Sequence, residues 1–356
     1  MHKTFLALTI FTFMAISIIA QPSKTKFFAA DHPAFTYQGR IDFSNPKAPR
    51  FWAAGTSVKV TFTGTFCDLE IQDEVLYGTY HNYLEISIDG KEPLRIQTKG
   101  KENKIRVAEN LKPGKHTLII SKGTEALMGY ITFVGLHCQS ITKSPVLHKR
   151  KIEFFGDSIT SGMGSITTDI PCDSGQWYDQ HSAWYSYAAI TARTLQADYH
   201  LTSESGIGLI HSCCDKPFTM PQVFNKVNLA KDSIDWNFSS YQPDLVSICL
   251  GQNDGIQDSL KFTTAYVKFI NTLRKAYPST QIVCLTSPMA DANLRNKLTN
   301  YLRGVVEYCK AQGETKIDYH TFQKSYNAGC GAHPDKAEHI QIATELADYL
   351  KKTMKW

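Results

Sequence analysis

The hydrophobic pattern of the chain changes near residue 145, and this change limits the possible folds more than any other feature. Upstream of it, apolar residues recur at every second position, as in Val58 and Val60. A period of two is typical of β-strands with one buried face, and turn sequences such as Asp89-Gly90 separate these runs. Because no helical pattern interrupts them, residues 21–143 are predicted to form an all-β jelly roll or sandwich.

From residue 149 onward, apolar strand-like runs alternate with helical patterns. Residues 151–155 and 245–250 are two such strands, and Ser182 is expected to cap a helix that runs to about Gln196. Strands that alternate with helices indicate a parallel sheet covered on both faces. Residues 149–356 are therefore predicted to be a second, α/β domain of three layers.

Residues 1–20 are predicted to be a signal peptide. A short polar or basic start precedes an apolar run from Phe5 to Ile19, and Ala20 provides a small residue for cleavage. An uncleaved anchor is the alternative, since the run is only slightly short of the roughly 20 residues that span a bilayer. The sequence thus predicts an exported chain, periplasmic or secreted, with no membrane contact after cleavage near Ala20.

Charge and cysteine content restrict the partners. The net charge is +5 over 356 residues, without a basic run, so nucleic acid is not an expected partner. Nine cysteines permit disulfides in an exported protein. Cys172 and Cys330 both flank the crevice predicted below and are a candidate pair. The sequence gives no indication of the oligomeric state.

Three segments that contain candidate catalytic residues follow three successive strands of the second domain. They contain Ser158 in Gly156-Asp157-Ser158, Gly206 in Ser205-Gly206, and Asn253 in Gly251-Gln252-Asn253. The ends of parallel strands meet at one crevice, where a serine hydroxyl, a glycine N–H and an asparagine amide would converge. The alternative is structural, because Asp and Ser commonly cap helices and Gly and Asn form turns.

A serine nucleophile needs a base. His333 lies in the turn-rich segment Gly331-Ala332-His333-Pro334 just before the terminal helix, a loop expected to return to the same crevice. His339 is the rival, but its position at a helix start favours a capping or packing role. No histidine or cysteine spacing typical of zinc appears, so no metal or other cofactor is expected.

Together these segments resemble the SGNH hydrolases, a subgroup of the GDSL esterases, and most closely carbohydrate esterase family two. Further landmarks of that family are Tyr37-Gln-Gly-Arg40 and Gly123-Thr-Glu125. The resemblance implies a jelly roll followed by an SGNH domain, and a serine esterase that removes O-acetyl groups from polysaccharides such as xylan or glucomannan. It assigns Ser158 as nucleophile, His333 as base, and the oxyanion hole to the Ser158 and Gly206 N–H groups and the Asn253 amide.

One departure from the family concerns the residue that orients the histidine. Most SGNH enzymes place an aspartate three residues before the histidine, where this chain has Cys330, and Gly331 occupies the other usual position. A backbone carbonyl, that of Ala332, is therefore expected to hold the His333 ring in a Ser–His dyad.

Two alternatives remain at this stage. The missing acid favours a carbohydrate-binding protein with a decayed esterase site, and four aromatic residues of the first domain are candidate sugar platforms: Trp52, Tyr77, Tyr80 and Tyr83. The second alternative is a GDSL lipase or esterase that acts on other acyl esters.

Overall fold

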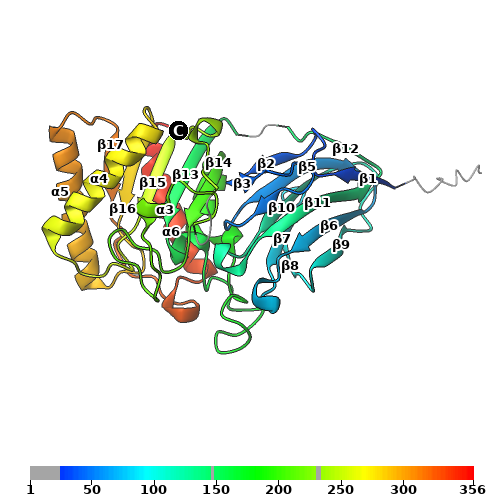
Figure 1. Ribbon diagram of the computed structural model, residues 1–356, viewed down its shortest axis with the longest axis horizontal. Helices are drawn as coiled ribbons and strands as arrows, with labels where there is room; N and C mark the ends of the chain where they lie inside the picture. Colours follow the sequence, from blue (N-terminus) through cyan, green and yellow to red (C-terminus); the bar gives the residue numbers. More distant parts are fainter. Residues whose placement is uncertain (1–24, 146–147, 230–233) are drawn as a thin grey trace, which may run out of the picture.

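The computed structural model describes residues 25–145, 148–229 and 234–356. Antiparallel strands form one lobe, and a sheet with helices on both sides forms the other (Figure 1). The expected signal peptide, residues 1–20, lies outside the described residues, and so does its cleavage site near Ala20. Within the described ranges, no helix is long and apolar enough to cross a membrane.

The N-terminal lobe contains two six-stranded sheets whose strands pair antiparallel. The first sheet has the order β3-β4-β11-β6-β9, with β1 also paired to β11; the bounds are β1 Lys26–Ala29, β3 Ile41–Asp42, β4 Arg50–Phe51, β6 Cys67–Asp73, β9 Glu102–Ala108 and β11 Ile131–Cys138. The second has the order β12-β5-β10-β7-β8, with β2 on β5; the bounds are β2 Thr36–Gln38, β5 Ser57–Thr63, β7 Tyr83–Ile88, β8 Leu94–Gln97, β10 Lys115–Lys122 and β12 Ser140–Thr142.

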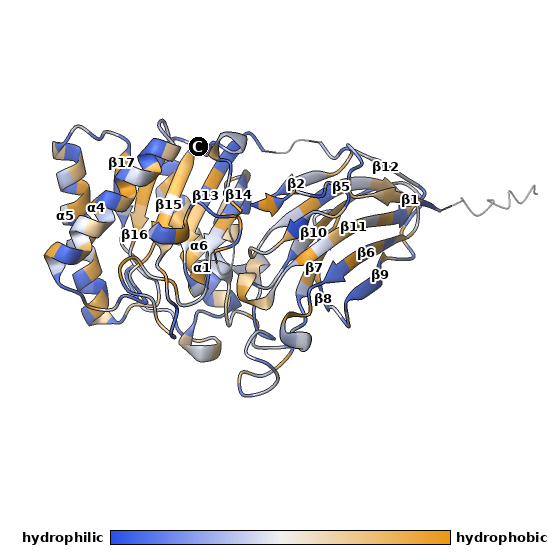
Figure 2. Cartoon of the chain, viewed as in Figure 1, coloured by the Kyte–Doolittle hydropathy of each residue, from blue (hydrophilic) through white to orange (hydrophobic). Residues whose placement is uncertain are grey.

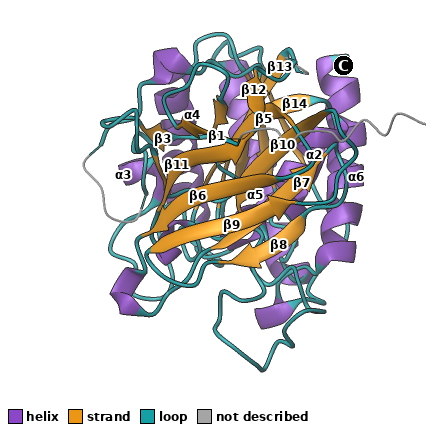
Figure 3. Ribbon diagram, turned by 90° about the vertical axis from the view of Figure 1, so that its right-hand side faces the viewer, coloured by secondary structure: helices purple, strands orange, loops and turns teal. Residues whose placement is uncertain are grey.

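The period-two residues of the two sheets meet in one core. Leu69 and Ile71 of β6 and Val58 and Val60 of β5 all belong to it. Figure 3 looks onto this lobe, with the helices of the second domain behind its strands. The all-β first domain predicted from the alternating pattern is confirmed.

The C-terminal lobe contains a five-stranded parallel sheet of order β14-β13-β15-β16-β17. Its strands are β13 Arg150–Gly156, β14 Ala197–Ser203, β15 Leu245–Cys249, β16 Gln281–Leu285 and β17 Ile317–His320. Its helices are α1 Ser158–Ser161, α2 Tyr187–Thr194, α3 Met220–Val223, α4 Ser259–Ala276, α5 Ala292–Ala311 and α6 Lys336–Met354.

Helices cover both faces of this sheet. On β13, Phe154 packs in a core with α2 and α6, whereas Phe155 packs in a core with α4 and α5. Burial on both faces explains the continuous apolar runs of the strands (Figure 2). The predicted three-layer α/β domain is confirmed.

The helix start expected at Ser182 is wrong. A 3-10 turn, Ala183–Tyr185, comes first, and α2 begins only at Tyr187, capped by the Ser186 hydroxyl. Ser186 has an extended backbone, φ −60° and ψ 141°, which separates the two elements. The Ser182 hydroxyl instead hydrogen-bonds the carboxylate of Glu85 on β7.

Glu85 lies where the two lobes are in contact. Its side chain is fully buried, although it lies on the face of β7 opposite the sandwich core, and it also accepts a hydrogen bond from the Trp184 amide at 3.0 Å. A second cross-lobe contact is the ion pair of Arg40 with Glu153, 2.7 Å long and buried. Around Glu85, the outer face of the second β-sheet thus packs against the α/β domain.

Candidate active site

Ser158 stands at the junction between β13 and α1. Asp157 caps the helix, its carboxylate accepting a hydrogen bond from the Ile159 amide at 3.1 Å. The tight turn requires Gly156, because a Cβ there would lie 2.0 Å from Thr160 Oγ1. Since Asp157 does the capping, the hydroxyl of Ser158 is left for another partner.

His333 is that partner, and it comes from the loop between the 3-10 turn Cys330–Ala332 and α6. Its Nε2 lies 2.7 Å from Ser158 Oγ, and its Nδ1 lies 2.9 Å from the carbonyl oxygen of Gly331. A carbonyl only accepts, so Nδ1 carries the ring proton and Nε2 accepts from the serine hydroxyl. Burial lowers the pKa of His333 below its ordinary value, which keeps the ring neutral at neutral pH.

The carbonyl that orients His333 belongs to Gly331, so the prediction of Ala332 is wrong by one residue. Gly331 and Ala332 have φ values of 62° and 55°, and two successive left-handed residues turn the earlier carbonyl toward the ring. The expected pair Cys172 and Cys330 is disulfide-bonded. This bond fastens the turn before His333 to the long loop between α1 and α2.

Ser158, His333, Gly206 and Asn253 line one cavity of about 710 Å³. Gly206 follows the end of β14 and Asn253 follows the end of β15, and both strands pair directly with β13. The parallel sheet therefore brings together the four side chains or backbone groups predicted from the sequence.

Three N–H donors belong to residues that line this cavity. Among the described residues, the amides of Ser158 and Gly206 have no acceptor. The side-chain amide of Asn253 donates to the Ile207 carbonyl at 2.9 Å and more weakly to Asp157 Oδ2 at 3.3 Å. Two donors are thus unoccupied, and the third has one long hydrogen bond, to Asp157 Oδ2. This arrangement suits an oxygen atom bearing negative charge.

A carboxylate from the β-sandwich supports the Gly206 segment. Glu125, 1% exposed, accepts hydrogen bonds from the Ser205 amide at 2.6 Å and the Ser205 hydroxyl at 2.5 Å. Burial raises the pKa of Glu125. His181, itself buried, has its Nδ1 3.8 Å from the same carboxylate. The first domain therefore helps to fix the backbone next to Gly206.

Both domains match known families. Residues 37–145 match the carbohydrate esterase 2 N-terminal family, and residues 154–338 match the GDSL-like lipase/acylhydrolase family. A solved family two carbohydrate esterase from Clostridium thermocellum, in complex with cellohexaose, superposes with a TM-score of 0.82 at 30% identity, covering 90% of this chain and 99% of that one. The chain belongs to carbohydrate esterase family two.

Two curated relatives extend this comparison. Cellulase/esterase CelE of Acetivibrio thermocellus is 31% identical over 334 residues, which cover 92% of this chain but only 40% of CelE. An acetylxylan esterase/glucomannan deacetylase of Cellvibrio japonicus is 25% identical over 353 residues, 94% of this chain and 93% of that protein. This family two chain thus spans less than half of CelE and nearly all of the second relative.

Two aromatic residues that sequence reasoning missed, Trp177 and Phe218, line the cavity of this family two chain, and Trp177 is the more informative. Its indole is 38% exposed, lines the cavity and packs edge-on against His181. It lies in an irregular loop, where no periodicity could single it out. Of the four aromatic residues considered from the sequence, Trp52 and Tyr83 are buried, and none of the four belongs to the described cavity lining.

His339 has a packing role. Its ring is fully buried in α6, and its Nδ1 accepts a hydrogen bond from the Tyr187 amide at 3.0 Å. Asp335, not His339, caps α6. His339 therefore helps to hold α2 against α6.

Proposed function

We propose that this chain is a serine esterase that removes O-acetyl groups from polysaccharide, with Ser158 as nucleophile and His333 as general base. The observation that supports it most is the 2.7 Å contact between Ser158 Oγ and His333 Nε2 at the wall of an accessible cavity. Hydrogen-bonded nucleophile and base are what acyl transfer to a hydroxyl requires.

In the proposed reaction, His333 Nε2 takes the hydroxyl proton as Ser158 Oγ attacks the acetyl carbonyl. The carbonyl oxygen becomes an oxyanion that the Ser158 and Gly206 amides stabilise, and each such donor lowers the barrier by roughly 3 kcal/mol. The imidazolium then protonates the departing sugar oxygen. Water, activated by the same ring, releases acetate from the acyl-enzyme and restores the serine.

Asn253 is proposed as the third donor. Its weaker hydrogen bond, to Asp157 Oδ2 at 3.3 Å, is the one it would exchange for the oxyanion, while the 2.9 Å bond to Ile207 keeps the amide in place. Gly331 replaces the usual acid of a triad, because its carbonyl fixes the ring tautomer without adding charge.

The acetylated polysaccharide substrate is supported by the names of the relatives and by the shape of the site. A Cellvibrio relative is described as an acetylxylan esterase/glucomannan deacetylase, and the Clostridium structure holds cellohexaose. The exposed Trp177 face beside the dyad provides an aromatic surface of the kind on which a sugar ring can stack.

Acetate release tests the proposed function. We expect hydrolysis of aryl acetates and acetate release from acetylated xylan or glucomannan, measured by NMR, with aryl octanoate turned over far more slowly. Preference for octanoate would favour the lipase alternative. Sugar binding without hydrolysis of any ester would favour the binding protein with a decayed site.

The pH dependence should report His333. Only the neutral ring accepts the serine proton, and burial lowers the pKa of His333 below its ordinary value of about 6.5. We therefore expect kcat/KM for an aryl acetate to fall on the acid side, with its midpoint below pH 6.5, and to be level through neutrality. A midpoint clearly above pH 7 would contradict this assignment.

Asp157 provides the control for that profile, because burial raises the pKa of its carboxyl to about 7. Asp157→Asn keeps an oxygen acceptor for the Ile159 amide but removes the titrating group. The acid limb should persist in this variant. Its disappearance would assign the limb to Asp157 instead.

We also infer export, on the strength of the apolar run from Phe5 to Ile19. N-terminal sequencing of the natural protein should find Gln21 or a close neighbour first, and an intact Met1 would reject cleavage near Ala20.

A further inference from the structure

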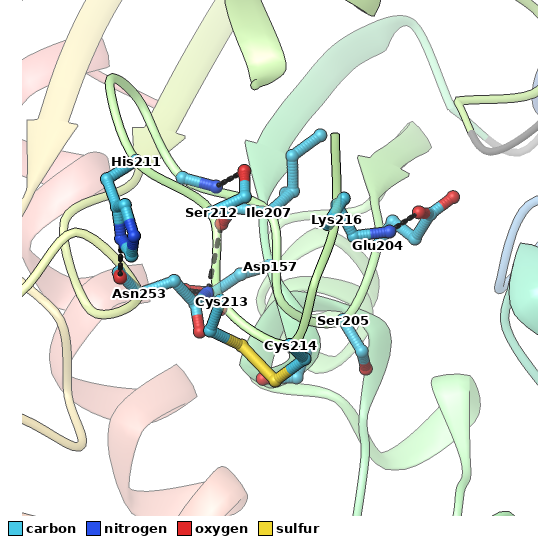
Figure 4. The surroundings of a disulfide bond; sticks show 12 residues. Asp157, Glu204, Ser205, Ile207, His211, Ser212, Cys213, Cys214, Lys216 and Asn253 are labelled. Atoms are coloured by element: carbon cyan, nitrogen blue, oxygen red, sulfur yellow. Dashed lines mark hydrogen bonds and ion pairs between the residues drawn. A yellow bond between two sulfur atoms is a disulfide. The ribbon is translucent and has the colours of Figure 1, made fainter. Parts of the chain in front are cut away.

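Two adjacent cysteines, Cys213 and Cys214, form a disulfide at the wall of the active-site cavity. Figure 4 shows the bond beside Ser205 and Asn253. The segment His211-Ser-Cys213-Cys214 has no further cysteine or histidine at the spacing of a zinc site. Neither sulfur has a part in the proposed reaction, so the disulfide calls for its own explanation.

The disulfide is packed on the backbone of Gly206. The Cys213 amide donates to the Gly206 carbonyl at 2.9 Å, and a Cβ added to Gly206 would lie 3.1 Å from Cys213 Sγ. The sulfur therefore lies against the α-carbon of Gly206, whose own N–H is a proposed oxyanion donor. A shift of Cys213 would displace that donor directly.

The loop that carries the disulfide is anchored at both ends. At its start, the carboxylate of Asp254, next to Asn253, accepts from the backbone amides of three consecutive residues, Leu209, Ile210 and His211. At its end, the Lys216 ammonium pairs with buried Glu204, and the Lys216 amide donates to the Cys213 carbonyl at 3.2 Å. Between these anchors, the disulfide joins Cys213 to Cys214 at the centre of the loop.

That centre has an uncommon backbone. Cys214 and Asp215 have φ values of 60° and 56°, a region that residues with a side chain seldom adopt in succession. The bond between the two sulfurs holds the first of these residues in place. Without it, only one hydrogen bond among the described residues closes this turn, from the Lys216 amide to the Cys213 carbonyl, and we expect residues 213–215 to shift and the hydrogen bond to Gly206 to weaken.

The Cys213–Cys214 bond is poorly placed to stabilise the whole fold. A disulfide stabilises a protein mainly by restricting the unfolded chain, and the effect grows with the number of residues enclosed. Cys172–Cys330 joins residues 158 positions apart, whereas Cys213–Cys214 joins neighbours. The adjacent bond thus has its main effect locally, on the loop and on Gly206.

We propose that the Cys213–Cys214 disulfide is a positioning element for the Gly206 oxyanion donor, so that its reduction by a dithiol lowers turnover. This inference rests on the proposed function. In the reduction, the dithiol passes two electrons to the S–S bond, each sulfur takes one proton, and the dithiol closes to its own disulfide. Reoxidation reverses the step and restores activity.

The first test compares wild type with C213S/C214S. We expect kcat for an aryl acetate to fall about 10- to 100-fold in the variant, less than the full loss of one oxyanion donor, with KM and the melting temperature nearly unchanged. Methaneboronic acid forms a tetrahedral adduct that places an oxygen in the oxyanion hole. Its inhibition constant should rise by the same factor as kcat falls, while the acid limb set by His333 stays in place.

The second test uses C172S/C330S, in which Cys213–Cys214 is the remaining disulfide of the described structure. The activity of C172S/C330S before reduction is the reference for its activity after reduction. Dithiothreitol should lower kcat by the same factor, with loss of the bond verified by alkylation and mass spectrometry, and oxidised glutathione should restore it.

The outcomes separate the two proposals. An inactive wild type overturns the proposed esterase. An active wild type with equal kcat in C213S/C214S, or with free thiols at both positions, overturns the positioning role and leaves the esterase intact.

Discussion

Replacing Ser158 with Ala should lower kcat for an aryl acetate by about 10⁴- to 10⁶-fold, to the residual rate that an oxyanion hole alone supports. The hydroxyl is the only group at 2.7 Å from His333 Nε2 among the described residues, so the ring has no other proton to take. Steady-state kinetics with purified protein measure the loss. Retained turnover would reject Ser158 as nucleophile.

Ser161→Ala is the matched control. Ser161 lies on the same short helix, and its buried hydroxyl bonds Ser203 Oγ at 2.9 Å rather than the histidine. It should retain most of the activity. Combining Ser158→Ala with His333→Ala should cost little beyond the single change, because the two residues act as one unit. Circular dichroism and the melting temperature show whether each variant is folded.

The largest expected effect on stability is that of Arg40→Met. The Arg40 guanidinium donates to Glu153 Oε1 at 2.7 and 3.0 Å, and both side chains are buried. Burial alone would raise the pKa of Glu153, but Arg40 and neighbouring donors hold it below its ordinary value. Removing Arg40 strands a buried charge, which costs about 3–5 kcal/mol. Thermal and urea unfolding should detect this loss.

Two further variants make that test specific. Glu153→Gln in the Arg40→Met background removes the stranded charge and should recover part of the stability. Lys351→Met breaks an exposed pair with Asp348 and should leave the melting temperature unchanged. If Arg40→Met left the melting temperature unchanged, as Lys351→Met should, the buried ion pair would not stabilise the contact between the two domains.

The sequence predicted the convergence of the site because three of the functional residues each follow the end of a parallel strand. Ser158, Gly206 and Asn253 are far apart in the chain. The parallel pairing of β13 with β14 and β15 brings the loops that follow these strands to the same edge of the sheet. Similarly, strict alternation in β5 identified the sandwich core without any knowledge of its partners.

What the sequence could not predict depends on dihedral angles and on contacts between the domains. The carbonyl of Gly331 rather than Ala332 faces His333 because of two left-handed residues, which no residue pattern required. Glu125 reaches Ser205 only through the docking of the two domains. Ser182 resembles a helix cap, but its hydroxyl is bound to Glu85 across the same interface.

The most direct test of the account is to trap the acyl-enzyme. Rapid acid quench during aryl acetate turnover, followed by peptide mass spectrometry, should find one acetyl group on the peptide that contains Ser158, and none in Ser158→Ala. An acetyl group on another residue, or turnover with no acetylated peptide at any quench time, would contradict a mechanism in which Ser158 is the nucleophile.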